Sequence, residues 1–321
     1  MRALVVGGAG YIGSVVTRLL LAQGHRVVVL DDCSTGHADS VPPGVDLVRA
    51  DITEAAGVLA GGGGFDAVLH FAAKSLVGES VAHPSRYWRT NVIGTRALLD
   101  AITEHRVPTL VFSSTAATYG EPTVVPITED APARPGNPYG ATKLAVDMMI
   151  TGECAATDLA AVSLRYFNVA GDALGAGERH AVETHLIPNA LAAVAGTGDP
   201  LTVFGDDWPT PDGTPIRDYV HVLDLARAHV QALTAADPGE HLICNLGSGD
   251  GYSVRQVLST IEQVTGRPVP HTVGPRRAGD PTRLVASHRR ALDRLGWAPE
   301  LGLSDMVADA WQFHTTGTTI R

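Results

Sequence analysis

Cysteine is scarce in this 321-residue chain. Cys33, Cys154 and Cys244 are scattered, and no two have the close spacing of a metal or disulfide motif. We interpret them as ordinary core or surface residues of a protein in a reducing compartment. The 13 histidines form no tight ligand cluster along the sequence, so no metal site is expected.

Long apolar runs are also lacking. No window approaches the roughly 18 apolar residues that a membrane-spanning helix needs. The opening stretch MRALVVGGAG has too short an apolar run for a signal-peptide core. We expect it to form the first strand, and we expect a cytoplasmic protein.

Positive charge is in deficit. The 24 Lys and Arg residues are outnumbered by 34 Asp and Glu residues, which gives a net charge of −10. This balance argues against a nucleic-acid-binding surface. An anionic small molecule stays possible, because a few local arginines bind phosphate whatever the global charge is.

Strand-like and helix-like segments alternate through the first half of the chain. Apolar runs predict strands at 3–7, 26–30, 46–50, 66–71, 109–114 and 159–167, with helices at 11–22, 84–105 and 138–155. Continuous apolar strands separated by helices indicate a doubly wound parallel sheet of the α/β class.

The rhythm changes after about residue 170, where Gly and Pro become frequent. Two further strand–helix units, beginning at DYVHV and at HLICNLG, are expected to return to the main sheet. We therefore predict a first domain over 1–170 that regains about 216–250. A smaller, discontinuous C-terminal domain occupies most of 171–321, with a cleft between the two.

A glycine-rich turn, GGAGYIG, follows the first strand and precedes the first helix. Gly7, Gly10 and Gly13 give the spacing of a dinucleotide turn, in which a pyrophosphate lies on the helix N-terminus. Asp31 and Asp32 end the second strand and suit a ribose diol, so NAD is preferred to NADP. Asp51 is placed to meet the adenine, or alternatively to cap a helix.

PYGATK, at 138–143, places Tyr139 and Lys143 four residues apart on one helical face. A phenol has a pKa of about 10, and a nearby ammonium and a cationic nicotinamide both lower it. On this interpretation the tyrosine can take a proton from a sugar hydroxyl; alternatively, the Tyr–Lys pair is incidental on an ordinary helix. Ser113, Ser114 and Thr115 end a strand and supply hydroxyls for a substrate oxygen; alternatively, they only cap that strand.

Motifs along the whole chain resemble the UDP-glucose 4-epimerases of the extended short-chain dehydrogenase/reductase superfamily. They are GGAGYIGS, LDDCSTGH, HFAAKSLVGESV, NVIGT, FSSTAATYG, NPYGATK, LRYFNVAG, PTPDGTPIRDYVHVLDLARAH, NLGSG and RRAGDP. The long block containing DGTPIRDYVHVLDLA is the most specific, and the glycine turn is the least.

The resemblance implies a Rossmann domain holding NAD, and transient oxidation of a UDP-hexose at C4. Tyr139 acts as base, assisted by Lys143, and Thr115 occupies the catalytic Ser/Thr position. It implies cofactor contacts at Gly7, Gly10, Tyr11, Ile12, Gly13, Asp31, Asp32, Asp51, Ile52, Phe71, Ala72, Ala73, Asn91, Ser113, Tyr139, Lys143 and Phe167. It implies substrate contacts at Thr115, Asn168, His185, Leu186, Thr202, Phe204, Arg217, Val254, Arg277, Asp280 and Leu284.

Residue chemistry agrees with several of the implied substrate contacts. Arg217 and Arg277 are fork-shaped donors suited to a diphosphate, Phe204 can stack on a uracil, and Asp280 can accept from a ribose hydroxyl. The plain alternatives are surface ion pairs for the arginines and core packing for the phenylalanine. Without the resemblance, these alternatives are the better interpretation.

Three positions depart from the pattern of well-known bacterial members. Ser75 stands where they carry a cofactor-side Lys, with Lys74 one place earlier. His185 replaces an Asn, and contributes either its ring or only its backbone. Leu284 replaces a Tyr that closes the sugar pocket; either N-acetylated UDP-hexoses are accepted as well, or the swap is neutral.

Other functions stay open or are disfavoured. A 4,6-dehydratase needs an acid and a base beside Thr115, where this chain has Ala116 and Ala117. A 4-epimerase of a UDP-pentose or UDP-glucuronate is not excluded. A catalytically silent NAD-binding regulator is disfavoured because Tyr139 and Lys143 are both present. The resemblance also implies a homodimer, formed through the helices at 84–105 and 138–155.

Overall fold

The computed structural model describes all residues except 62, 278–279, 318 and 320–321. Parts of the GGGG and RRAGDP stretches therefore lie outside the described residues. Among the described helices, none is long and apolar enough to cross a membrane.

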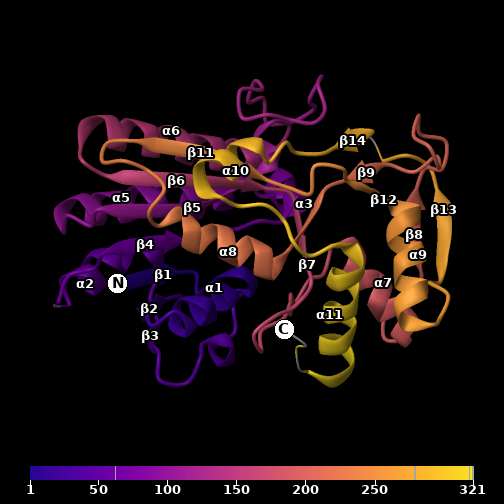
Figure 1. Cartoon of the computed structure of the whole chain (residues 1–321), viewed down its shortest axis with the longest axis horizontal. Helices are drawn as coiled ribbons and strands as arrows, with labels where there is room; N and C mark the ends of the chain where they lie inside the picture. The colour runs from indigo at the N-terminus through magenta and orange to yellow at the C-terminus, as the bar shows by residue number, and fades with distance from the viewer. Residues whose placement is uncertain (62, 278–279, 318, 320–321) are drawn as a thin grey trace.

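A seven-stranded parallel sheet forms the centre of the larger part of the molecule (Figure 1). Its strand order is β11-β6-β5-β4-β1-β2-β3, the order of a doubly wound nucleotide-binding sheet extended by one strand. The strands are β1 (Arg2–Val6), β2 (Arg26–Leu30), β3 (Asp46–Val48), β4 (Ala67–His70), β5 (Thr109–Thr115), β6 (Ala160–Tyr166) and β11 (His241–Leu246).

Helices cover both faces of this sheet and build a separate core on each. One core contains residues of α1 (Tyr11–Ala22), α8 (Val222–Ala232) and α10 (Arg289–Leu295). The other contains residues of α2 (Ala55–Ala60), α5 (Gly94–Glu104) and α6 (Pro138–Ala156). The predicted α/β class with a doubly wound parallel sheet is confirmed.

Short helical segments connect these elements. They are α3 (Val77–Ala82), α4 (Pro84–Tyr87), the π-helical segment η3 (Trp88–Ile93), and the 3-10 turns η1 (Ala38–Ser40), η2 (Ile52–Glu54) and η4 (Ala116–Thr118). The single helix predicted over 84–105 is thus three consecutive helical segments, α4, η3 and α5. Its start and end agree with the prediction, but the apolar periodicity did not reveal the change of helical pitch.

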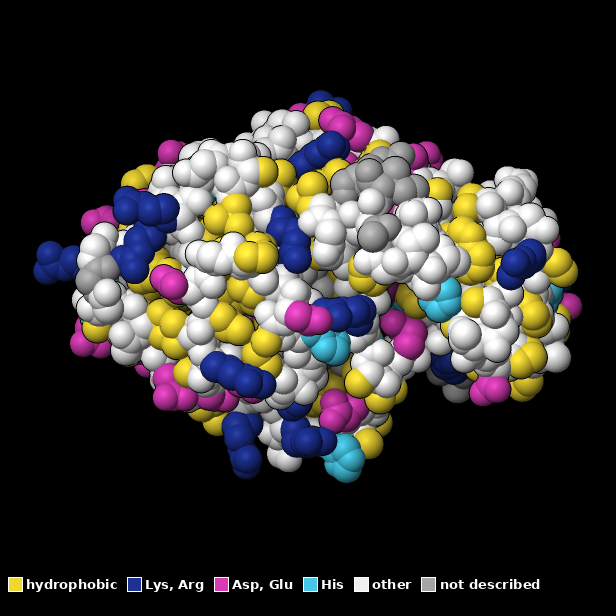
Figure 2. Space-filling view, turned by 90° about the horizontal axis from the view of Figure 1, so that it is seen from below, with side chains coloured by type: hydrophobic (Ala, Val, Ile, Leu, Met, Phe, Trp, Pro, Cys, Tyr) yellow, Lys and Arg dark blue, Asp and Glu magenta, His cyan; other side chains and the backbone are white. Residues whose placement is uncertain are grey.

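A third core holds the smaller part together, on the right of Figure 1. Its residues come mainly from α7 (Leu186–Ala195), α9 (Val254–Thr265) and α11 (Leu303–Thr316). Short paired strands surround them: β7 (Asn168–Ala170) with β10 (Tyr219–His221), β8 (Leu201–Phe204) with β13 (His271–Gly274), and β9 (Ile216–Arg217) between β12 (Tyr252–Ser253) and β14 (Arg283–Leu284). On the face in Figure 2, side chains of both charges are interspersed over the two parts.

The two predicted returns to the main sheet were half right. The HLICNLG strand does return, as β11 beside β6, but its following helix α9 joins the third core, and α10 packs on β11 instead. The DYVHV prediction was wrong for the strand, because β10 pairs only with β7. Its helix α8 does return, and packs against α1.

Candidate active site

The glycine turn joins β1 to α1 under tight steric limits. Gly7 has a φ of +86°, and a Cβ there would lie 2.5 Å from the Ala72 nitrogen. A Cβ at Gly13 would lie 2.3 Å from the Gly7 oxygen. Gly10 is the N-cap of α1, with no capping side chain and no acidic residue in the first turn. The first backbone N–H groups of α1 are thus left for an anion.

Acidic side chains end the second strand, as predicted. Asp31 is buried, and its carboxylate accepts hydrogen bonds from the nitrogens of Ala9 (2.9 Å) and Cys33 (2.8 Å). Burial raises its pKa. Asp32 is exposed and accepts from the Ser34 nitrogen at 2.8 Å. Asp31 therefore braces the glycine turn while both carboxylates lie at the same edge of the sheet.

Asp51 caps a helical turn, which is the second of the two interpretations of this residue. Its carboxylate accepts from the Thr53 nitrogen at 2.9 Å, and Glu54 completes a capping box on η2. The side chain remains exposed, whereas the neighbouring Ile52 is buried in the second core. Asp51 thus keeps solvent-facing oxygens while its backbone is fixed.

A loop of small residues follows β4 next to the glycine turn. The nitrogens of Phe71 and Ala72 both donate to the Val6 oxygen, at 2.7 and 3.1 Å. Asn91 is buried, and its amide group bonds both the nitrogen (2.8 Å) and the oxygen (3.0 Å) of Lys74. Asn91 therefore holds the loop containing Ala73. Of the two candidate cofactor-side residues, Lys74 is half-buried and Ser75 is exposed.

Tyr139 stands in the first turn of α6, where Pro138 occupies the first position and Asn137 caps the helix by accepting from the Gly140 nitrogen at 2.9 Å. Thr115, at the carboxyl end of β5, hydrogen-bonds the phenol and lowers its pKa. Burial outweighs this bond and raises the pKa of Tyr139 overall.

In the chain without cofactor, the pKa of Tyr139 is set by burial and by Thr115, and the Lys143 ammonium is engaged elsewhere. Lys143 is buried, and its Nζ donates to the Ser113 oxygen at 2.7 Å and lies 4.7 Å from the Phe112 ring centroid. Burial lowers the pKa of Lys143 to about 7, against an opposing effect of Asp147. The ammonium is therefore directed at a carbonyl and is close to losing its proton.

Hydroxyls at the end of β5 divide into two groups. Ser113 hydrogen-bonds the Tyr166 hydroxyl, and Ser114 donates to Asp147 at 3.2 Å. Thr115 instead contacts Tyr139 and caps η4 by accepting from the Ala117 nitrogen. Thr115 is thus the hydroxyl of this set that lies beside the candidate base.

Sequence reasoning missed three supporting residues around this centre. Asp147 forms a buried ion pair with Arg165 at 2.8 Å, and Tyr87 packs edge-on against the Tyr139 ring, 6.5 Å between centroids. Only the four-residue spacing from Lys143 to Asp147 was visible as a signal in the sequence.

Predicted substrate residues gather on the smaller part. Thr202 and Phe204 alternate on β8 and both are exposed, so they share one face. The Arg277 guanidinium lies 4.2 Å over the Phe204 ring. Arg217 on β9 donates to the Pro281 oxygen at 2.8 Å, and its Nη2 lies 3.9 Å from Asp280.

The remaining predicted contacts lie around this group. Leu284 on β14 is the register partner of Arg217, and Val254 begins α9. The Asn168 amide donates to the Asp218 oxygen at 2.8 Å, so this side chain is held by the residue that precedes β10. Phe167 precedes Asn168 between β6 and β7 and is half-buried.

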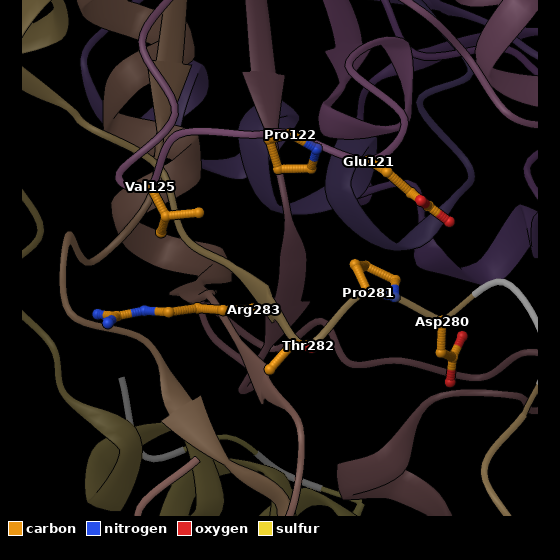
Figure 3. Close-up of a pocket in the computed structure, with 7 residues that line it drawn as sticks. All are labelled: Glu121, Pro122, Val125, Asp280, Pro281, Thr282 and Arg283. Carbon is orange, nitrogen blue, oxygen red and sulfur yellow. The ribbon is translucent and has the colours of Figure 1, made fainter. Parts of the chain in front are cut away.

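A pocket of about 340 Å³ opens where the loop after β5 meets the segment before β14 (Figure 3). Glu121 and Pro122 lie across from Pro281 in this view, and Asp280 forms another part of the lining. Tyr139 does not line it. The pocket therefore adjoins the Asp280 side of the predicted substrate site and does not contain the candidate base.

His185, at the N-cap of α7 just before Leu186, does not point its ring nitrogen to solvent. Its Nδ1 lies 2.8 Å from carboxylate oxygens of both Glu178 and Glu183. His180 joins them, and the expectation of no tight ligand cluster was wrong. The signal in the sequence is an alternation of two Glu with two His over residues 178–185, and not a run of histidines.

Comparisons with known proteins agree with this geometry. Residues 3–247 match the model of the NAD dependent epimerase/dehydratase family. A UDP-glucose 4-epimerase of Corynebacterium glutamicum is 55% identical, covering 98% of this chain and 95% of its own length; one of Streptomyces lividans is 54% identical, covering 98% and 96%. The crystal structure of a UDP-glucose 4-epimerase from Brucella ovis in complex with NAD is 44% identical, with a TM-score of 0.92 over 100% of this chain and 99% of that one.

Proposed function

The chain belongs to the NAD dependent epimerase/dehydratase family, and on this premise we propose that it is a UDP-glucose 4-epimerase, which interconverts UDP-glucose and UDP-galactose in galactose metabolism. The observation that carries the proposal is the placement of Thr115 beside Tyr139, where it lowers the pKa of the phenol, with Lys143 buried one helical turn along α6. This group stands at the carboxyl end of a central strand, where parallel sheets place their ligands.

The residues of the glycine turn fit NAD. The uncapped N-terminus of α1 offers N–H groups to a pyrophosphate. A Cβ at Gly10 would lie 3.4 Å from the Gly7 oxygen, its nearest neighbour, so the space beside Gly10 is open to a ligand. Asp31 and Asp32 would hold the adenosine ribose, and Asp51 and Ile52 would lie at the adenine. Bound NAD supplies the acceptor, and later the donor, for the C4 hydrogen of the sugar.

Tyr139 moves the proton in this proposal. Its oxygen takes the proton of the sugar 4-hydroxyl on oxidation and returns it on reduction, while the Thr115 hydroxyl orients the 4-oxygen. Since burial raises the pKa of Tyr139 in the chain alone, the positive charge that lowers it must come with the cofactor. Lys143 then positions the ribose and adds charge when protonated.

The UDP part of the substrate belongs on the smaller part of the molecule. We assign the diphosphate to Arg217 and Arg277, the uracil to the face carrying Phe204 and Thr202, and the ribose to Asp280. His185 contributes its backbone here, because its ring faces two carboxylates. In domain terms, residues 1–170 with about 216–250 hold NAD, and most of 171–321 holds the UDP-sugar.

The exact sugar depends on Leu284. This residue is half-buried beside Arg217, and a leucine leaves more room than a tyrosine next to the sugar C2 substituent. We propose that UDP-N-acetylgalactosamine is also a substrate. Absence of detectable turnover with it, alongside turnover of UDP-galactose, contradicts this extension while leaving the main activity intact.

We further propose a cytoplasmic homodimer. Exposed apolar side chains lie on α6 and on two segments that pack against it: Met148 (68% exposed) on α6, Val81 (63%) on α3 and Ile93 (62%) on η3. An apolar surface of this kind is typical of a subunit contact.

The decisive experiment is incubation of purified protein with UDP-galactose and UDP-N-acetylgalactosamine without added NAD, followed by product separation. We expect UDP-glucose to form, and no product with any UDP-hexose, UDP-pentose or UDP-glucuronate contradicts the enzymatic assignment. A protein with neither bound NAD nor activity would revive the alternative of a catalytically silent regulator.

A Tyr139→Phe variant tests the base. It keeps the ring and its contact with Tyr87, and we expect turnover to fall by about 10²–10⁴ while bound NAD is retained. Full activity of this variant would mean that another group carries the proton.

A further inference from the structure

Four side chains converge in the loop between β7 and α7. Glu178, His180, Glu183 and His185 each offer one ligand atom, and these atoms all lie within 4.8 Å of one another. We propose that this loop is a binding site for one Zn²⁺ ion, separate from the Tyr139 centre and structural in role.

The separations match those between the ligands of one ion. The Nδ1 atoms of His180 and His185 lie 3.0 and 2.8 Å from the same oxygen of Glu178. The His180 Nδ1 lies 3.6 Å from Glu183, and the His185 Nδ1 lies 2.8 Å from it. Zinc–ligand bonds of about 2.0–2.1 Å in a tetrahedron place the ligand atoms about 3.3 Å apart. These His–Glu distances need only small changes, whereas the widest separation in the cluster, up to 4.8 Å, must shorten by about 1.5 Å.

A second observation is the enclosure of a ring nitrogen between two carboxylates. The His185 Nδ1 is enclosed, and it makes no well-aligned hydrogen bond in spite of two carboxylate oxygens within 2.8 Å. Glu183 also accepts from the backbone nitrogens of Thr184 and His185, both at 2.7 Å. The His185 Nδ1 is therefore directed into the cluster, where Glu178 and Glu183 outweigh burial and raise the pKa of His185 to about 10. A metal ion bound there takes the place of that proton.

The donor set selects the kind of metal. Two imidazole nitrogens with two carboxylate oxygens suit Zn²⁺, whereas Ca²⁺ and Mg²⁺ prefer oxygen ligands alone. Four protein ligands in a stretch of eight residues complete a tetrahedral shell and leave no open position for a substrate. The ligand spacing Glu-x-His-x-x-Glu-x-His lets one short loop surround the ion.

Contacts of the loop with neighbouring elements show which segments a bound ion would hold together. The Glu178 nitrogen donates to the Asp172 carboxylate at 2.6 Å, and the His180 ring packs edge-on against the Tyr11 ring of α1, 6.4 Å between centroids. Arg179 pairs with Asp39 at 2.7 Å. The bound ion would thus hold this loop closed against the elements that flank the glycine turn.

Metal uptake by the full-length protein tests the proposal. After dialysis against a chelator, Zn²⁺ binding is measured by competition with a chromophoric chelator, and Co²⁺ is added separately to record its visible spectrum. We expect one ion per chain and the intense Co²⁺ absorption of a four-coordinate site. The melting temperature should rise with Zn²⁺.

Variants assign the ion to the four residues. His180→Ala and Glu183→Gln should weaken Zn²⁺ binding at least about tenfold and abolish the rise in melting temperature. His83→Ala, an exposed histidine in the connection between α3 and α4, should bind like the wild type. Far-UV circular dichroism shows whether each variant is folded.

The contrary outcomes are distinct. Equal Zn²⁺ binding by wild type and both ligand variants, or no binding by the wild type, identifies the cluster as an ion-pair network and overturns the proposal. If His180→Ala does not fold, the nearly isosteric Glu183→Gln variant and the Co²⁺ spectrum of the wild type still decide. Epimerase activity is recorded separately, so failure of one proposal does not mask the other.

Discussion

At the scale of single residues, the site depends on two buried groups whose pKa values burial shifts in opposite senses. The pKa of Tyr139 is raised and the pKa of Lys143 is lowered, because in each case burial disfavours the charged form. The chain therefore holds a neutral phenol next to an amine that is close to neutral. Tyr139 becomes a phenolate only when a bound cationic ligand lowers its pKa. Lys143 becomes an ammonium only when it takes up a proton.

Lys143 predicts a specific dependence of stability on pH. The unfolded chain keeps the lysine proton up to about pH 10.4, whereas the folded, NAD-free chain releases it near pH 7. Between these values unfolding takes up a proton, so stability rises with pH. Below pH 7 both states are protonated, and the burial cost is fully present.

We therefore expect Lys143→Met to gain stability relative to the wild type most strongly near and below pH 7. The gap should narrow as pH rises toward 10. Urea unfolding of cofactor-free protein across this range measures it. Lys74→Met, at the only other lysine, is the matched control and should show no such trend. A gap that stays constant with pH would contradict the lowered pKa.

At the scale of elements, the β1–α1 turn is set by backbone contact. Gly7 needs both a positive φ and the absence of a Cβ, whereas Gly24, past the end of α1, has a φ of +80° and open space around it. We expect Gly24→Ala to cost about 1–2 kcal/mol for the left-handed backbone alone. Gly7→Ala should cost clearly more and lose NAD.

Urea denaturation and the amount of NAD released on heating measure the two effects. Equal destabilisation by the two substitutions would show that the contact with Ala72 is relieved by a backbone shift.

Elements whose signal is local were predictable, and those set by tertiary pairing were not. Apolar runs gave β2 with its exact limits and β5 and β6 to within a residue or two. The strand β10 carries the same apolar signal, but pairs with β7 because that partner is fixed only in the fold. Likewise, Tyr139 and Lys143 were visible as a spacing, whereas the Tyr166 contact with Ser113 joins residues far apart in sequence.

At the scale of the whole molecule, the two parts divide the chemistry. The part built on the large sheet carries the glycine turn and, on α6, the candidate base, and the smaller part carries the two arginines and Phe204. The chain passes between them several times, through β7, β9 and β11. A UDP-sugar bound across this boundary would therefore depend on both parts at once.

The helical surface formed by α3, η3 and α6 gives the last prediction. Ile93 and Met148 are 62% and 68% exposed on segments that pack against each other. If two copies meet here, Ile93→Glu with Met148→Glu places charges in an apolar contact, which is costly without a partner. We expect this double variant to become monomeric in size-exclusion chromatography with light scattering. Val273→Glu, a 50% exposed apolar position on β13 in the smaller part, should leave the wild-type dimer intact, and a double variant that stays dimeric would place the subunit contact on another face.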